Sequence, residues 1–223
     1  MTKLKFWGKQ YLDNLTIIVG VAVLMLVFLA VGEIELSSGM DNLFLEGIAL
    51  FPYYLCFSAS FAILLIGVGT FQTYFPVLVS MNVTRKSVVN GIMLCILAIM
   101  FTVLAVAALV WKFVPLKGME LNVQVLLLFG GVQLIFASLS LVCGYVVARW
   151  KKVGTIVMGA VGLIVGGSVG ASVSIFGNMG FLHVIMDLIE KFQFTWVFVL
   201  GLVLYLMVGI FIRVSTKKLE IRM

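Results

Sequence analysis

The chain alternates long apolar segments with short polar ones. Six segments contain no charged residue and are long enough to cross a bilayer as helices, which takes about 20 residues each. They run over residues 15–32, 47–70, 87–111, 121–148, 153–175 and 192–212. This pattern predicts an all-α integral membrane protein with six transmembrane helices. Because no linker or long repeat separates the segments, we expect a single transmembrane domain over residues 1–223.

Composition supports a membrane environment. The chain is 63% hydrophobic and 11% charged, well above the roughly 45–50% apolar content of soluble domains. Its net charge of +6 does not indicate nucleic-acid binding, because the basic residues form short clusters between apolar segments. Cys56, Cys95 and Cys143 are odd in number and lie within apolar segments, so we expect small buried side chains and not a disulfide framework.

The charged residues divide between the two sides that six crossings define. One side, which includes both termini, collects Lys3, Lys5, Lys9, Arg85, Lys86, Arg149, Lys151, Lys152, Arg213, Lys217, Lys218 and Arg222. The other side collects Glu33, Glu35, Asp41, Glu46, Glu120, Asp187 and Glu190, with Lys112, Lys117 and Lys191. Basic residues mark the cytoplasmic side of membrane proteins. The predicted topology therefore has both termini in the cytoplasm.

The amino-terminal segment has an amphipathic pattern. Helical spacing places Leu4, Trp7 and Tyr11 on one face, and Lys5 and Lys9 on the opposite one. Such a pattern is typical of a helix lying in the membrane interface, here over residues 1–14. The alternative is a basic flank that only orients the first span.

The connection between the second and third spans contains a proline and two turn-forming residues. Pro76 interrupts a helix that continues from the second span but suits the first turn of a new one. Asn82 can end that short helix, and Thr84 can cap the next one. The sequence thus predicts a span, a break, a short cytoplasmic helix and a turn. The alternative is a second span that runs long with a proline kink.

A second short helix is expected on the outer side, over residues 181–191. His183 and Asp187 share its polar face, opposite an apolar one. This pattern predicts a surface or short re-entrant helix before the last span. A solvated charged face explains it most simply, since the single histidine of the chain has no cluster of metal ligands around it.

Two groups of residues within the spans suggest specific roles. Gly162, Gly166 and Gly170 of the fifth span have GxxxG spacing, which allows helices to approach closely, either at a dimer interface or within the bundle. In the second span, Tyr53, Tyr54, Phe57 and Phe61 could line a path for an amphipathic cargo. Aromatic residues of membrane helices also pack against neighbours or lie at the interface.

Several kinds of chemistry have no residues to support them. No Asp or Glu lies deep in a predicted span, and polar residues there are uncharged, namely Asn90, Gln133, Ser138 and Ser140. Ion-coupled transport usually needs ionisable groups at that depth. The sequence also lacks a phosphate-binding GxxxxGK[ST] loop, an HExxH pair and a GxSxG motif. We therefore expect no enzyme activity, no catalytic residue and no metal site in this chain.

The segment FPVLVSMNVTRKSVVNG, residues 75–91, resembles the permease subunits of type-2 ATP-binding-cassette (ABC) exporters, especially the compact Gram-positive bacterial kind. The family has glycine where this chain has Asn82, and both residues tolerate the left-handed turn. An amphipathic helix before the first span and a short external helix before the last are also features of that family.

The resemblance implies a function and partners. Two permeases, identical or different, pair in the bacterial plasma membrane, and each binds a cytoplasmic ATPase that holds the ATP and Mg. The coupling helix would comprise Pro76, Val77, Leu78, Val79, Ser80, Met81 and Asn82. Arg85 and Lys86 would anchor the next span at the lipid headgroups. Cargo would be an amphipathic or hydrophobic peptide, lipid or drug, and an apolar contact through Leu78 and Val79 would reach the ATPase.

Two other functions fit a six-helix membrane protein of this size. One is the substrate-binding membrane subunit of an energy-coupling-factor vitamin importer. The other is a membrane immunity or assembly protein that binds its target within the bilayer. An adjacent ATPase gene would favour the exporter, and a lone gene with a vitamin-regulated leader would favour the importer subunit.

The charge segregation yields a test of the topology. Cysteines introduced at Lys152 or Lys217 should be shielded from an impermeant thiol reagent in intact cells, whereas one introduced at Asp41 should react. Labelling from outside at Lys152 would contradict the six-span arrangement.

Overall fold

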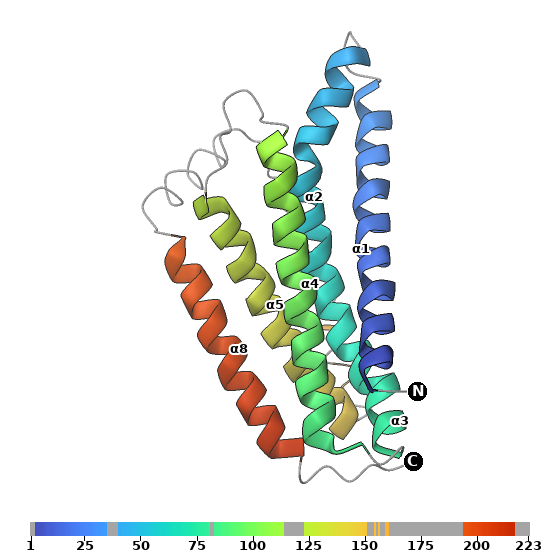
Figure 1. The fold of residues 1–223 in the computed structure, drawn as a ribbon, viewed down its shortest axis with the longest axis vertical. Coiled ribbons are helices and arrows are strands. Elements are labelled where there is room, and N and C mark those ends of the chain that lie inside the picture. Colours follow the sequence, from blue (N-terminus) through green and yellow to red (C-terminus); the bar gives the residue numbers. More distant parts are fainter. Residues whose placement is uncertain are drawn as a thin grey trace.

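The computed structural model describes residues 3–34, 40–80, 83–113, 123–150, 154, 156, 159–160 and 194–216. Side chains are described at these positions except 3–5, 25–50, 53 and 54. The described chain is helical, without a strand, as the sequence predicts. Its helices form a bundle (Figure 1). They are α1 (Lys3–Ile34), α2 (Met40–Gly69), α3 (Phe75–Ser80), α4 (Arg85–Phe113), α5 (Val123–Arg149) and α8 (Thr195–Ser215).

Four stretches have the length and hydropathy of membrane spans, counted over the described residues. They are Leu55–Ser80, Arg85–Phe113, Val123–Arg149 and Thr195–Ser215. The last three agree within a few residues with the predicted spans over 87–111, 121–148 and 192–212. The described residues therefore support a multi-pass helical membrane protein. The count of six stays a prediction, because most of the predicted fifth span lies outside the described residues, as do Gly162, Gly166, Gly170 and the external helix over 181–191.

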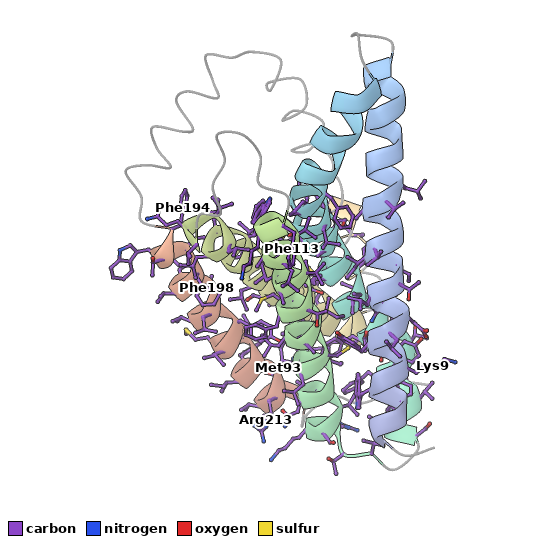
Figure 2. All side chains as sticks on the ribbon, turned by 45° about the horizontal axis from the view of Figure 1, so that its top comes forward. Lys9, Met93, Phe113, Phe194, Phe198 and Arg213 are labelled. Carbon is purple, nitrogen blue, oxygen red and sulfur yellow. The ribbon has the colours of Figure 1, made fainter. Side chains whose placement is uncertain are left out.

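The described helices run in two opposite directions along the bundle. α1 and α4 start at the end of the bundle where α3 lies, and α2, α5 and α8 run toward that end (Figure 1). Hydrogen bonds confirm that α2 and α5 are parallel, because Gln133 bonds to the carbonyl of Cys56 and Ser140 to that of Ile63. α5 and α8 likewise run in the same direction (Figure 1). The basic residues Arg85, Arg149 and Arg213 all lie at the end that holds α3, and Figure 2 shows Arg213 there, with Phe113 and Phe194 at the other end.

The amino-terminal segment is not a separate interfacial helix. Residues 3–34 form one continuous helix of 32 residues, about 48 Å long. The prediction of an independent helix over 1–14 is therefore wrong. Neither a proline nor any other strong helix breaker separates Tyr11 from Leu15, and the apolar face of the segment packs on protein, since Phe6, Trp7 and Tyr11 contact the core. Lys9 and Asp13 lie on the exposed face.

The second span continues past its predicted end at residue 70. Thr70–Tyr74 form a π-helical turn that joins α2 directly to α3, and the N–H of Phe75 donates to the carbonyl of Thr70. The predicted break at Pro76 is therefore absent, and the alternative of a long second span is the better description. The wider turn explains how the helix passes this point: Pro76 cannot donate a hydrogen bond, and in an α-helix its ring would meet the carbonyl four residues earlier.

Small residues bring α5 close to both of its neighbours. A Cβ atom added at Gly131 would lie 2.8 Å from the backbone nitrogen of Phe198, and one added at Gly201 would lie 2.7 Å from the carbonyl oxygen of Gly131. On the opposite side, a Cβ atom at Gly144 would lie 3.0 Å from the carbonyl oxygen of Gly67. Contacts this short need glycine, so α5 packs against α2 and α8 almost backbone to backbone.

The outermost described helix, α8, buries a narrow stripe. Gly201, Tyr205, Gly209 and Ile212 form its buried face, and the Tyr205 hydroxyl donates to the carbonyl of Met93 at 2.8 Å. Figure 2 shows Met93 in the region between α4 and α8. The remaining surface of α8 consists largely of exposed apolar side chains. Lipid is the solvent that suits such a surface.

The close contact of α5 with α8 gives a prediction for stability. We expect Gly131→Ala to destabilise the bundle by about 1–3 kcal/mol, the usual effect of overpacking, because the new methyl group would meet backbone atoms of α8 that cannot rotate away. Thermal unfolding in detergent micelles would measure the change. Gly20→Ala is the matched control, since no atom lies within 4 Å of its added Cβ, and a helical alanine should be neutral or stabilising. Equal stability of the two variants would contradict the close packing.

Candidate functional site at the basic end of the bundle

The short helix α3 exposes one side and buries the other. Phe75 and Leu78 belong to the hydrophobic core, and Leu78 is only 8% exposed. Val77 is 51% exposed, and Ser80 is also exposed. Burial of Leu78 does not support a direct partner contact through this side chain, because it packs in the core and holds α3 on the bundle. Val77 is the apolar side chain of α3 that a partner could reach.

The turn after α3 is closed by the backbone. The N–H of Val83 donates to the carbonyl of Leu78 at 3.1 Å. This hydrogen bond closes a turn of six residues, as in the Schellman motif that ends many helices. Helix α4 then starts at Arg85 as predicted, and the carbonyl of Thr84 accepts the bond from the N–H of Val88. Met81 and Asn82 lie outside the described residues, so the role of Asn82 stays a prediction.

The π-helical turn and α3 are braced by α1. The Phe6 ring meets the Tyr74 ring edge to face, with centroids 5.4 Å apart. Gln10 donates from Nε2 to the Thr70 hydroxyl at 2.9 Å. Trp7 covers Gly91 of α4, where any side chain would collide with the indole. The first turns of α1 thus contact both helices that enter and leave the α3 region.

Basic side chains surround this end of the bundle. The Arg85 guanidinium donates to the carbonyl of Thr216 at 3.5 Å, which joins the start of α4 to the end of α8. Arg149 donates to the Tyr145 hydroxyl at 2.9 Å and lies 4.7 Å from the Trp150 ring centroid. Lys86 is exposed. Arginine and tryptophan side chains in such positions suit the headgroup region of a bilayer.

The predicted cargo path is described in part. Phe57 and Phe61 lie on one face of α2 with their ring centroids 4.8 Å apart, and Phe136 of α5 extends the group, with its centroid 5.8 Å from that of Phe61. Phe57 is 38% exposed. The side chains of Tyr53 and Tyr54 lie outside the described set. The structure therefore adds Phe136, which sequence reasoning missed because it lies on another helix.

Buried polar side chains of α5 bond across to α2. The Ser140 hydroxyl lies 2.9 and 2.7 Å from the carbonyl oxygens of Ile63 and Leu64. The Gln133 amide donates to the carbonyl of Cys56 at 3.2 Å. Both residues stand out in the sequence as uncharged polar positions, but only the structure identifies their acceptors.

The cysteines behave as the sequence predicts. Cys56, Cys95 and Cys143 are buried and free. Among the described residues, no group of three His, Cys, Asp or Glu side chains gathers where a metal ion could bind. His183 lies outside this part of the chain.

In comparisons with known proteins, no family model, curated protein or solved structure matches this chain.

The two faces of α3 give a stability prediction. Leu78→Asp should destabilise the protein by about 2–5 kcal/mol, the range for losing a buried leucine, with a further penalty for a buried carboxylate. Val77→Asp should change stability by less than about 0.5 kcal/mol, as an exposed substitution. Thermal unfolding of both variants in the same detergent would measure this difference. A larger effect at Val77 than at Leu78 would reverse the assignment of the two faces.

Proposed function

We propose that this chain is the membrane-spanning permease subunit of an ATP-driven exporter that moves an amphipathic or hydrophobic cargo out of the cell. In this proposal a separate cytoplasmic ABC ATPase binds ATP and Mg, and a second permease subunit completes the transporter. The membrane is the bacterial plasma membrane, with both termini on the cytoplasmic side.

The observation that carries the proposal is the geometry of α3. An exposed valine projects from a short helix that is held to the bundle by Phe75 and Leu78 and joined to α2 and α4 without a long loop. A partner that pushes on Val77 would therefore move α2 and α4 directly. An ATPase needs such a rigid connection if its closure is to rearrange the spans. A flexible loop at this place would absorb the motion instead.

The charge pattern supports the same orientation. Arg85, Arg149 and Arg213 end or begin helices at the end where α3 lies, and the positive-inside rule places that end in the cytoplasm, where ATP is found. The described parts of α2, α4, α5 and α8 that could span the membrane carry no acidic residue. Energy from a partner ATPase fits that composition better than energy from an ion gradient.

Val77 offers a direct test of the coupling. The chain would be co-expressed with candidate ABC ATPases, and the amount of each ATPase that copurifies would be measured. We expect Val77→Asp to reduce the amount of copurifying ATPase by about tenfold or more, because the new carboxylate would be buried in an apolar contact with the ATPase. Expression and thermal stability should stay at the parental level, since Val77 does not belong to the core.

The matched control is Val77→Leu, which keeps an apolar side chain and should retain the ATPase. If Val77→Asp keeps its ATPase and transports at the parental rate, α3 is not the coupling element. If no ATPase copurifies with the unmodified chain, the exporter proposal itself is wrong, and a membrane immunity or assembly role becomes the better interpretation.

A further inference from the structure

Gln133 has one half of its amide bonded and the other half without a partner. This side chain is 0% exposed. Its Nε2 donates to the carbonyl of Cys56 at 3.2 Å, whereas its Oε1 is buried and has no hydrogen-bond partner. Turning the amide over would place Oε1 against the Cys56 carbonyl oxygen, and two acceptors would then face each other. The bond to α2 therefore fixes which half of the amide is free.

The free half can only accept a hydrogen bond. An unpaired acceptor inside a helical membrane bundle is unfavourable, because neither protein nor lipid supplies a donor there. The neighbouring carbonyl of Cys56 already accepts from the Ser60 hydroxyl at 3.0 Å as well as from Gln133. The atom left without a partner at this position between α2 and α5 is therefore the acceptor oxygen Oε1.

Aromatic rings connect this position with the exposed surface of α2. Phe57 follows Cys56 in the chain and is partly exposed, and its ring packs on Phe61. The Phe61 ring packs on Phe136, which follows Gln133 by about one helical turn on α5. The three rings thus form a connected apolar group that runs from the exposed surface of α2 to the helical turn of α5 next to Gln133.

We propose that Gln133 and the aromatic group Phe57, Phe61 and Phe136 form a ligand-binding site for amphipathic molecules that carry an uncharged hydrogen-bond donor, an amide N–H or a hydroxyl. Oε1 accepts the donor, and the rings hold the apolar part. A deprotonated carboxylate is disfavoured because it offers Oε1 no donor and would be buried without a countercharge. A cation is disfavoured because α5 and residues 51–69 of α2 contain no acidic residue to balance its charge. The interpretation of this ligand as cargo rests on the proposed function, but the binding itself does not.

A pair of probes that differ in one property tests the site. Decanamide carries an amide donor, and methyl decanoate has the same acyl chain with acceptors only. The unmodified protein would be placed in phosphatidylcholine nanodiscs, and its thermal unfolding followed by tryptophan fluorescence. At about ten times its Kd, decanamide should raise Tm by about 3–5 °C, whereas methyl decanoate should leave Tm unchanged.

Two variants locate the effect. Gln133→Met keeps the length of the side chain and removes both polar atoms, so it should fold and lose the decanamide shift. Phe57→Leu removes a partly exposed ring and should reduce the shift without unfolding the protein. Equal shifts by both probes on the unmodified protein would overturn the site, as would a decanamide shift that persists undiminished in either variant. Because the assay contains no ATPase, its failure would leave the Val77 test of the exporter untouched.

Discussion

The close approach of α5 to α2 on one side and to α8 on the other is the constraint on which the bundle depends. Lipid tails are as apolar as the helix surfaces, so burial of apolar area does not drive helices together in a bilayer. Backbone contact at Gly131 and Gly201, and side-chain bonds such as that of Ser140 to the carbonyls of α2, supply the attraction instead. With α5 held in this way, α8 can present most of its remaining surface to lipid or to a partner.

Helix α2 connects the two functional regions proposed here. Cys56 and Phe57 lie near the binding site at Gln133, and the same helix continues through the π-helical turn into α3 with Val77. Because Ser140 and Gln133 tie α2 to α5 at separate levels, displacement of α3 would act on the ligand region through a stiff element. π-Helical turns are frequent at functional sites because they interrupt the regular bond pattern and let a helix change its packing. In the proposed exporter, this turn is where motion of the ATPase enters the membrane bundle.

The structure differs from the sequence-based expectations where a local signal competes with packing. Pro76 usually ends a helix, and the sequence therefore predicts a break. The helix instead widens into a π turn, because the core contacts of Phe71, Phe75 and Leu78 keep the chain in line with α2. The amino-terminal pattern of aromatic and basic residues is typical of an interfacial helix, yet Trp7 finds Gly91 of α4 as a partner. Local signals left the long second span as an alternative only, and they could not predict the contact of Trp7 with Gly91, which is distant in the chain.

The sequence by itself determined that this is a helical chain with segments apolar enough to cross a membrane, where α4, α5 and α8 begin and end to within a few residues, and that its charges are segregated. Each of these properties follows from hydropathy, length and charge along the chain, because the bilayer acts on every segment separately. The tertiary structure alone decided which glycines meet backbone, that Leu78 is buried while Val77 is exposed, and that Gln133 keeps a buried oxygen without a partner. These are properties of pairs of helices. In a span that is apolar on all sides, periodicity does not distinguish the face that meets protein from the face that meets lipid, so only the packed bundle defines them.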